Sequence, residues 1–450
     1  MMEDKLYQIL LDVKKNNLEL CEKLNDECSI LDYSDCAIDN IWTTALQNAL
    51  LDHEIVVVPP RSIPYLIDNT VIIPSNRKLI LYGATLLLSE GTDVLMMRNE
   101  HPVDQTHSFA KGKRDKNITI LGGTIMESRT ERAGYGRSGK FDHDRSMYGV
   151  STCLFFNSIN HLTIRDVTFS NCAAFAIQAG EMEDCVFENI SFVSCYADGL
   201  HFGGNIKNIY IKDVKGNVGD DLVALNMYDW QNSSVNFGPG ENIWCENLSL
   251  ARDGKYKAIR LEPGTYYFDD GTTVDCALKN VVVKSVRGIR TFKLYMQTPP
   301  YLIGQQPEKG DVGSAENIVF EDIKADFFAP IDKFSEYTES DPIRGTSAVF
   351  ELGANIKGLK LKNIHITLHK EDLPEGYLVC IGPKSIVRNG KEVFDPYIKC
   401  KADGISLEDV FVNGTKLTST DGFIKEIEFE DVNGDGNSTG RGQFGKISFR

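Results

Sequence analysis

A four-residue pattern returns along much of the chain and limits its possible folds more than any other feature. It consists of an apolar residue, a mostly charged residue, Asp, Asn or Ser, and then Ile, Val or Leu. The copies start at Ile164, Phe187, Ile211, Cys245, Val283, Phe320, Leu361, Leu407 and Phe429. The first three copies begin 23 and 24 residues apart, and later gaps lengthen to between 34 and 46 before closing to 22. A coil of constant length with loops inserted into it explains this spacing.

A period near 23 residues with two or three short strands per turn fits an all-β fold, the right-handed parallel β-helix. Leucine-rich repeats share the period but need a Leu-x-x-Leu-x-Leu spine, and propeller blades are about twice as long. Neither fits this chain. The larger insertions, near 228–240, 265–275, 298–313 and 329–346, are predicted to be loops on the side that binds a ligand.

The N-terminal segment has helical periodicity instead. Residues 3–25 place apolar side chains near one side of a first helix, namely Leu6, Ile9, Leu10, Val13, Leu20 and Leu24. A second helix is expected over 41–51. These helices could form an oligomer contact, but a cap over the open end of the solenoid is favoured, because uncovered strands pair with other chains. We therefore predict a helical cap at 1–52 and a β-helix domain at 53–450, with its active-site cleft around 196–297.

Charge and cysteine content narrow the possible partners. The formal charge of -16 argues against a nucleic acid or an anionic membrane as partner. No signal peptide and no apolar run of roughly 18 residues is recognisable, so a cytoplasmic location is expected. The eleven cysteines show no Cys-x-x-Cys spacing and are interpreted as reduced core residues. A monomer and a homo-oligomer are both compatible with the sequence.

Three aspartates form the strongest candidate for a catalytic site. Asp198 lies in Tyr196-Ala-Asp-Gly, and Asp220 and Asp221 follow Gly219. Asp198 and Asp221 are 23 residues apart, so in a β-helix they should stack at about 4.8 Å. Carboxylates this close cannot all ionise freely, and one of them should become a general acid, as glycosidic bond cleavage requires. Each Asp alone could cap a turn, but their joint spacing favours catalysis.

Strand alternation predicts a strip of polar side chains beside these aspartates. Its basic members could hold the carboxylate of a uronic acid or the hydroxyls of a neutral sugar. Aromatic residues near Trp230 and Tyr266 could stack on sugar rings or pack a loop. The predicted substrate-binding residues are His201, Asn226, Lys257, Arg260, Glu262, Arg290 and Lys293.

The sequence also resembles a known family. The stretch 32–88 is similar to the opening coils of pectin-degrading β-helix proteins, with the pectin-lyase-like fold. The run 154–226 resembles the polygalacturonases, glycoside hydrolase family 28, through Gly219-Asp-Asp and the Asp198-Gly element. The resemblance implies that Asp220 is the general acid, that Asp198 and Asp221 activate the attacking water, and that the anomeric carbon is inverted.

The chain departs from that family's motifs in three places. Of the Asn-Thr-Asp motif only Asp198 remains, and Gly254-Lys-Tyr-Lys257 stands where the family has Gly-His-Gly. The Arg-Ile-Lys motif survives loosely between Arg290 and Lys293, with one extra residue. A spacing near 5 Å between carboxylates would by itself suggest a retaining enzyme. On the resemblance we expect inversion.

The expected function is hydrolysis of a pectin-type or related oligosaccharide or polysaccharide, without a cofactor or a metal. A cytoplasmic address favours short imported oligosaccharides. A uronate lyase or epimerase is one alternative, with Asp142, Asp144, Asp269 and Asp270 as weak candidates for calcium ligands. A non-catalytic glycan-binding solenoid is the other. No phosphate loop, nucleophile elbow or zinc motif is found.

Overall fold

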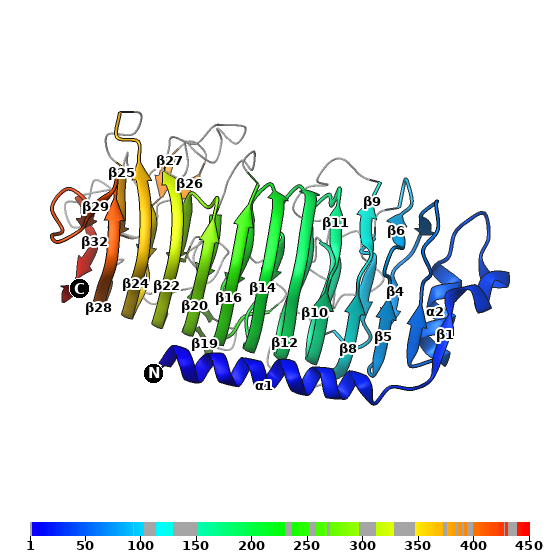
Figure 1. The fold of residues 1–450 in the computed structure, drawn as a ribbon. Coiled ribbons are helices and arrows are strands. Elements are labelled where there is room, and N and C mark those ends of the chain that lie inside the picture. The colour runs from blue at the N-terminus through cyan, green and yellow to red at the C-terminus, as the bar shows by residue number, and fades with distance from the viewer. Residues whose placement is uncertain are drawn as a thin grey trace.

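The computed structural model describes residues 2–92, 94–102, 114–128, 152–229, 236–251, 258–267, 271–296, 312–327, 347–371, 376–382, 386–388, 391–393, 399–426, 428–430 and 439–450. In these residues the chain winds into a long parallel β-helix (Figure 1). Strands of successive coils pair in parallel and in register, one above the other. The predicted fold class is confirmed.

The strands form stacks that run the length of the solenoid. The N-terminal coils hold β1 (Glu27–Ser29), β2 (Ile55–Val57), β3 (Tyr65–Ile67), β4 (Val71–Ile73), β5 (Arg77–Ile80), β6 (Thr85–Leu88), β7 (Met97–Asn99), β8 (Asp115–Leu121), β9 (Thr124–Glu127) and β11 (Thr168–Ser170). The stack of long strands is β10 (Thr152–Arg165), β12 (Phe175–Cys195), β14 (Ile206–Val218), β16 (Gly240–Leu250), β20 (Leu278–Arg287), β22 (Ser314–Phe327), β24 (Asn355–Leu368) and β28 (Lys399–Val412).

A second stack of shorter strands carries the candidate site. It consists of β13 (Leu200–Phe202), β15 (Asp221–Asn226), β17 (Ala258–Glu262), β21 (Thr291–Tyr295), β23 (Ser347–Gly353), β25 (Gly376–Ile381) and β30 (Ile424–Glu426). The remaining strands are β18 (Gly264–Tyr267), β19 (Thr273–Cys276), β26 (Ile386–Arg388), β27 (Lys391–Val393), β29 (Thr415–Lys416), β31 (Glu428–Glu430), β32 (Thr439–Phe444) and β33 (Ile447–Phe449).

The third position of the repeating pattern is a left-handed bend in each long strand. Its residues have φ between 51° and 62°, a region that Asn and Asp tolerate better than other side chains. Their side chains also bond between coils, as when Asn189 Nδ2 donates to Asp166 Oδ1 at 2.7 Å. The members are Asp166, Asn189, Asp213, Asn247, Ser285, Asp322, Asn363 and Asp409. The pattern found in the sequence is therefore the corner of the coil.

A second corner is built from a ladder of asparagines. Asn208 donates to Asp184, Asn242 to Asn208, and Asn280 to Asn242, at 2.8 to 3.0 Å. Asn317 continues the ladder by donating to Asn280 at 3.0 Å. All five residues have positive φ, so backbone geometry and side-chain bonding select the same residue type. The ladder fixes the register of the coils.

The second position of the pattern forms a row of alternating charges across the coils. Lys212 Nζ lies 3.8 Å from Glu246 Oε1, and Lys362 Nζ lies 2.9 Å from Glu321 Oε1. Each such cross-strand pair contributes roughly 0.2–1 kcal/mol, and a slip of one coil would place like charges together. The row runs through Arg165, Glu188, Lys212, Glu246, Lys284, Glu321, Lys362 and Glu408.

The helix α1 (Met2–Glu22) was expected to cap the end of the solenoid, but it does not. It lies lengthwise along the flank (Figure 1), where Leu6, Leu10 and Val13 are buried. Tyr7 packs on Trp244 with ring centroids 4.9 Å apart. The cause is an apolar stripe in register across the long strands, formed by Val186, Tyr210, Trp244, Val282 and Val319.

The N-terminal end is covered by other elements. These are the 3₁₀ helix η1 (Ile30–Cys36) and the helix α2 (Thr43–Asp52), which contact each other. Ala45, Leu46 and Ala49 of α2 join the core that runs through the coils. The cap function therefore belongs to α2, and the domain boundary at residue 52 stays a prediction.

All eleven cysteines carry free thiols, and ten of them are buried. This agrees with their interpretation as core residues. Among the described residues, no helix combines the length and the apolar character that crossing a membrane would need.

The asparagine ladder yields a stability prediction. Asn242→Ala should lower the midpoint of thermal unfolding more than Asn242→Gly. Both variants lose two ladder bonds, each worth about 1 kcal/mol, but only Ala places a Cβ in the left-handed region, at roughly 1–2 kcal/mol more. Circular dichroism melting measures the difference. The exposed Lys207→Ala should melt like the wild type, and equal melting of both Asn242 variants would contradict this account.

Candidate active site

The turn before β15 brings two aspartates beside the turn before β13. Gly219 is required there, because a Cβ at this position would lie 1.9 Å from the carbonyl oxygen of Tyr196 in the preceding coil. Its amide donates to the carbonyl of Cys195 at 2.9 Å. The amide of Asp221 then donates to Asp198 Oδ1 at 2.9 Å. The predicted one-coil stacking of Asp198 and Asp221 is therefore present.

Three carboxylates meet at this point. Oxygens of Asp198, Asp220 and Asp221 lie within 4.8 Å of one another. Their surroundings differ, since Asp198 and Asp221 are buried whereas the Asp220 side chain is 35% exposed. Asp220 is thus the member of the group that a molecule arriving from solvent reaches first.

The buried member Asp221 has a strongly altered acidity. Burial is the main cause, and the charges of Asp220 and Asp198 add to it. Arg260 and Lys293 act in the opposite direction. Together these effects raise the pKa of Asp221 to about 7. A group that gains and loses a proton near neutral pH suits acid–base chemistry.

Arg260 on β17 is the cation at the centre of the site. Its Nε lies 2.7 Å from Asp221 Oδ2, and its Nη atoms lie 4.0 Å from Asp220 and 3.6 Å from Glu262. Glu262 is fully buried. Such buried charges are tolerated because each lies beside an opposite charge.

The other predicted strip residues on β15 and β21 lie in register with Arg260 and Glu262. Asn226 pairs with Glu262, and Lys293 pairs with Arg260, between neighbouring strands. Lys293 pairs in turn with the buried Glu351 of β23. Alternation therefore placed these side chains on the predicted face, but they are almost as buried as the core.

His201 lies in a different position from the substrate contact expected for it. Its Nδ1 lies 2.7 Å from Asp198 Oδ2, and its Nε2 lies 3.0 Å from Asp229 Oδ2. The ring stacks on Phe175 with centroids 4.1 Å apart. Burial alone would lower the pKa of His201, but the two carboxylates raise it to about 10. His201 is therefore a buried cation at neutral pH.

The remaining sequence-predicted residues are not brought to the three carboxylates by any described contact. The guanidinium of Arg290 lies 4.6 Å from the ring centroid of Phe327. Tyr266 is buried and stacks on Phe237 at 3.9 Å, so its ring packs a loop. Lys257, Trp230, Asp142, Asp144, Asp269 and Asp270 lie outside the described residues.

Sequence reasoning missed Asp229, which lies just after β15. Its only signal was its place three residues after Asn226, on a segment already assigned to the site. Alternation gives no direction for a residue beyond the end of a strand. Its pairing with His201 could therefore be read only from coordinates.

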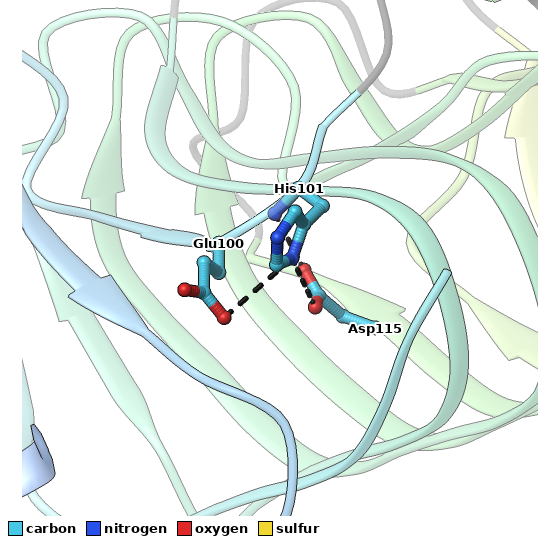
Figure 2. A group of neighbouring side chains, drawn as sticks. All are labelled: Glu100, His101 and Asp115. Atoms are coloured by element: carbon cyan, nitrogen blue, oxygen red, sulfur yellow. Dashed lines mark hydrogen bonds and ion pairs between the residues drawn. The ribbon is translucent and has the colours of Figure 1, made fainter. Parts of the chain in front are cut away.

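A second acidic cluster lies in the N-terminal coils (Figure 2). Asp115 accepts hydrogen bonds from the amide of His101 at 2.6 Å, from Asn99 Nδ2 at 2.8 Å and from Ser75 Oγ at 3.0 Å. His101 Nδ1 lies 2.8 Å from the same carboxylate and 3.5 Å from Glu100. Asp115 is fully buried, so these bonds anchor the chain at this corner.

Part of the chain is similar in sequence to a known protein. No protein-family model matches the chain. An exopolygalacturonase from Platanus acerifolia is 28% identical over 218 residues, covering 47% of this chain and 49% of the relative. The chain thus spans about half the length of the curated relative it matches.

Two solved structures of a phage tailspike protein share the fold of the chain. A double mutant of the tailspike protein of E. coli bacteriophage HK620 is 10% identical with a TM-score of 0.55, covering 86% of this chain and 63% of its own. The same tailspike in complex with a pentasaccharide is 10% identical with a TM-score of 0.53, covering 87% of this chain and 64% of its own. An exopolygalacturonase from Thermotoga maritima is 11% identical with a TM-score of 0.45, covering 90% of this chain and 97% of its own. The chain therefore shares the parallel β-helix fold with these tailspike structures, and part of its sequence is similar to an exopolygalacturonase, which agrees with the resemblance found in its motifs.

The acidity of His201 predicts a pH dependence of stability. Because its pKa rises from 6.5 to about 10 on folding, its stabilisation is complete below pH 6.5 and is lost as the pH rises through 10. The wild type should lose on the order of a few kcal/mol more than His201→Asn between pH 6.5 and 10. Urea unfolding at each pH measures this. Parallel curves for the two proteins would contradict the buried cation.

Proposed function

We propose that this protein is a glycoside hydrolase that cleaves a pectin-type or related oligosaccharide through Asp198, Asp220 and Asp221. The observation that carries the proposal is the meeting of three carboxylates in unequal environments within 4.8 Å. Glycosidic bond cleavage needs one carboxyl group that gives a proton and another that directs a nucleophile. The sequence similarity to an exopolygalacturonase supports the same class of reaction.

Different exposure suggests different roles. Asp220 is the most accessible of the three, so we assign it as the general acid that protonates the leaving oxygen. Asp198 and Asp221 are buried behind it and would hold and deprotonate the attacking water. The raised pKa of Asp221, about 7, allows it to take up that proton near neutral pH.

The proposed stereochemical outcome is inversion. Carboxylates this close would by distance alone fit a retaining enzyme. However, both oxygens of Asp198 already have partners, His201 and the amide of Asp221, and Asp221 Oδ2 is paired with Arg260. Carboxylates held in this way are better placed to accept a hydrogen bond from the attacking water than to form a covalent bond to the sugar.

The substrate is proposed to be a carbohydrate with several hydroxyl groups near the cleaved bond. Two described cations of the site, Arg260 and Lys293, lie beside acidic side chains. They can therefore orient hydroxyls through neighbouring carboxylates as well as attract a uronate. A panel of saturated oligogalacturonides, rhamnogalacturonan fragments and neutral oligosaccharides identifies which of these is cleaved.

We propose a cytoplasmic location as well. The eleven free thiols support this location. They include those of Cys172 and Cys195, whose backbones lie opposite each other on adjacent coils. In an oxidising compartment, neighbouring cysteines commonly form disulfides. Fractionation of the source cells tests this, and recovery outside the cytoplasm would contradict it.

Hydrolysis is tested by NMR of the first product formed on the oligosaccharide panel. We expect a saturated product whose new reducing end has the opposite anomeric configuration to the bond cleaved. A product of the same configuration would refute inversion. An unsaturated uronate would replace hydrolysis by a lyase reaction.

The role of Asp220 is tested by Asp220→Asn. The variant should keep binding the oligosaccharide but lose about 10²–10⁴-fold in kcat, the usual contribution of a general acid. Asp213→Asn, at a half-buried corner of the solenoid outside the site, is the matched control and should keep wild-type activity. An unchanged kcat in Asp220→Asn would contradict the assigned role, whereas binding of the oligosaccharide without any cleavage by the wild type would favour a binding solenoid.

A further inference from the structure

His201 is held at both ring nitrogens by buried carboxylates. Asp198 lies 2.7 Å from Nδ1 and Asp229 lies 3.0 Å from Nε2, and all three residues are at most 3% exposed. The flat face of the ring is covered by Phe175 at 4.1 Å. The imidazole can therefore neither rotate nor reach a sugar without breaking one of these contacts.

This arrangement determines how Asp198 is presented. Its Oδ2 faces the imidazole of His201, and its Oδ1 accepts from the amide of Asp221. A carboxylate with one fixed partner on each oxygen has a defined plane, and its remaining lone pairs point in fixed directions. The negative charge on Asp198 is stabilised by the cation beside it.

We propose that His201 is a positioning residue that fixes the orientation and charge of Asp198, and that Asp229 completes it as the outer carboxylate of an Asp229–His201–Asp198 clamp. This inference rests on the proposed hydrolytic function of the site. It assigns His201 a role behind the reacting groups in place of substrate contact. It also gives a function to Asp229, on the segment that follows Asp221 and Asn226 of β15.

The electrostatic surroundings support the clamp. Two carboxylates facing one imidazole keep it protonated, and the pKa of about 10 agrees with this. On β12, the uncharged Phe175 stacks on the ring, and Gln178 lies opposite His201 in the strand register. Among the described residues, the charged groups closest to His201 in this network are Asp198 before β13 and Asp229 after β15, and behind Asp198 lie Asp221 on β15 and Arg260 on β17.

Two isosteric substitutions separate positioning from packing. The amide nitrogen of Asn can occupy the place of His Nδ1, and that of Gln the place of Nε2. His201→Asn therefore keeps a donor for Asp198, whereas His201→Gln keeps a donor for Asp229 only. We expect His201→Asn to stay within about tenfold of wild-type kcat, and His201→Gln to lose on the order of 100-fold, with little change in KM.

If His201 only filled space, the kcat of His201→Asn would not be expected to exceed that of His201→Gln. If His201→Gln were as active as His201→Asn, the positioning role would be refuted. If the main change were in KM, His201 would be a substrate contact, and the proposal would again be wrong. Thermal melting of each variant shows whether it is folded.

Asp229→Asn tests the outer carboxylate. The substitution keeps an oxygen for Nε2 but removes the charge that helps hold the imidazolium. We expect kcat to fall about tenfold at unchanged KM, and the alkaline limb of its pH profile to move to lower pH. Asp166→Asn is the matched control, because Asp166 also accepts two side-chain hydrogen bonds, from Tyr82 and Asn189, outside the site. A wild-type profile for Asp229→Asn would overturn the clamp.

A measurement without substrate separates this inference from the proposed function. NMR of the histidine side-chain nitrogens should show His201 protonated on both nitrogens at pH 8 in the wild type. In Asp229→Asn, His201 should lose its second proton at a lower pH than in the wild type. A neutral imidazole in the wild type at pH 8 would refute the clamp even if Asp220→Asn is inactive. If no glycan is processed, the positioning role fails with the function, and only the ionic clamp remains.

Discussion

The left-handed corner residue that recurs along the described stack of long strands is the constraint on which the rest of this structure depends. Asp and Asn, which fill most of these corners, tolerate the left-handed bend better than other side chains, and at several corners the side chain bonds to its equivalent in a neighbouring coil. The coils therefore keep one register while loops of varied length leave from other corners. Because of this register, residues one period apart in sequence meet in space. Asp198 and Asp221 are such a pair, and their contact is a direct consequence of the winding.

The site concentrates charge where the fold would otherwise place solvent or apolar side chains. Arg260 and His201 each contact at least two carboxylates while almost fully buried. Burying ions costs several kcal/mol each, and mutual pairing offsets that cost only with good geometry. The long stack of apolar coils supplies the stability against which such a site can be maintained. Asp220, the partly exposed member, links this buried network to solvent.

Much of this architecture could be predicted from the sequence, for reasons that particular residues make clear. The spacing of the corner residues gave the period, and strand alternation placed Arg260 and Lys293 on one face. Alternation says nothing about depth, so the burial of both was not foreseen. Helical periodicity identified α1 but not its place, because the apolar stripe on which it packs is visible only once the strands are in register. The direction of His201 toward Asp229 depends on a loop conformation that no period encodes.

The central claim is that three carboxylates on adjacent coils act together on one glycosidic bond. The most direct test is a crystal structure of an inactive variant at position 220 soaked with the best oligosaccharide. We expect the bridging oxygen of the sugar within hydrogen-bond distance of the residue at position 220, and a water held between Asp198 and Asp221 on the side of the anomeric carbon. A saccharide bound on another face of the solenoid, with these carboxylates untouched, would contradict the account.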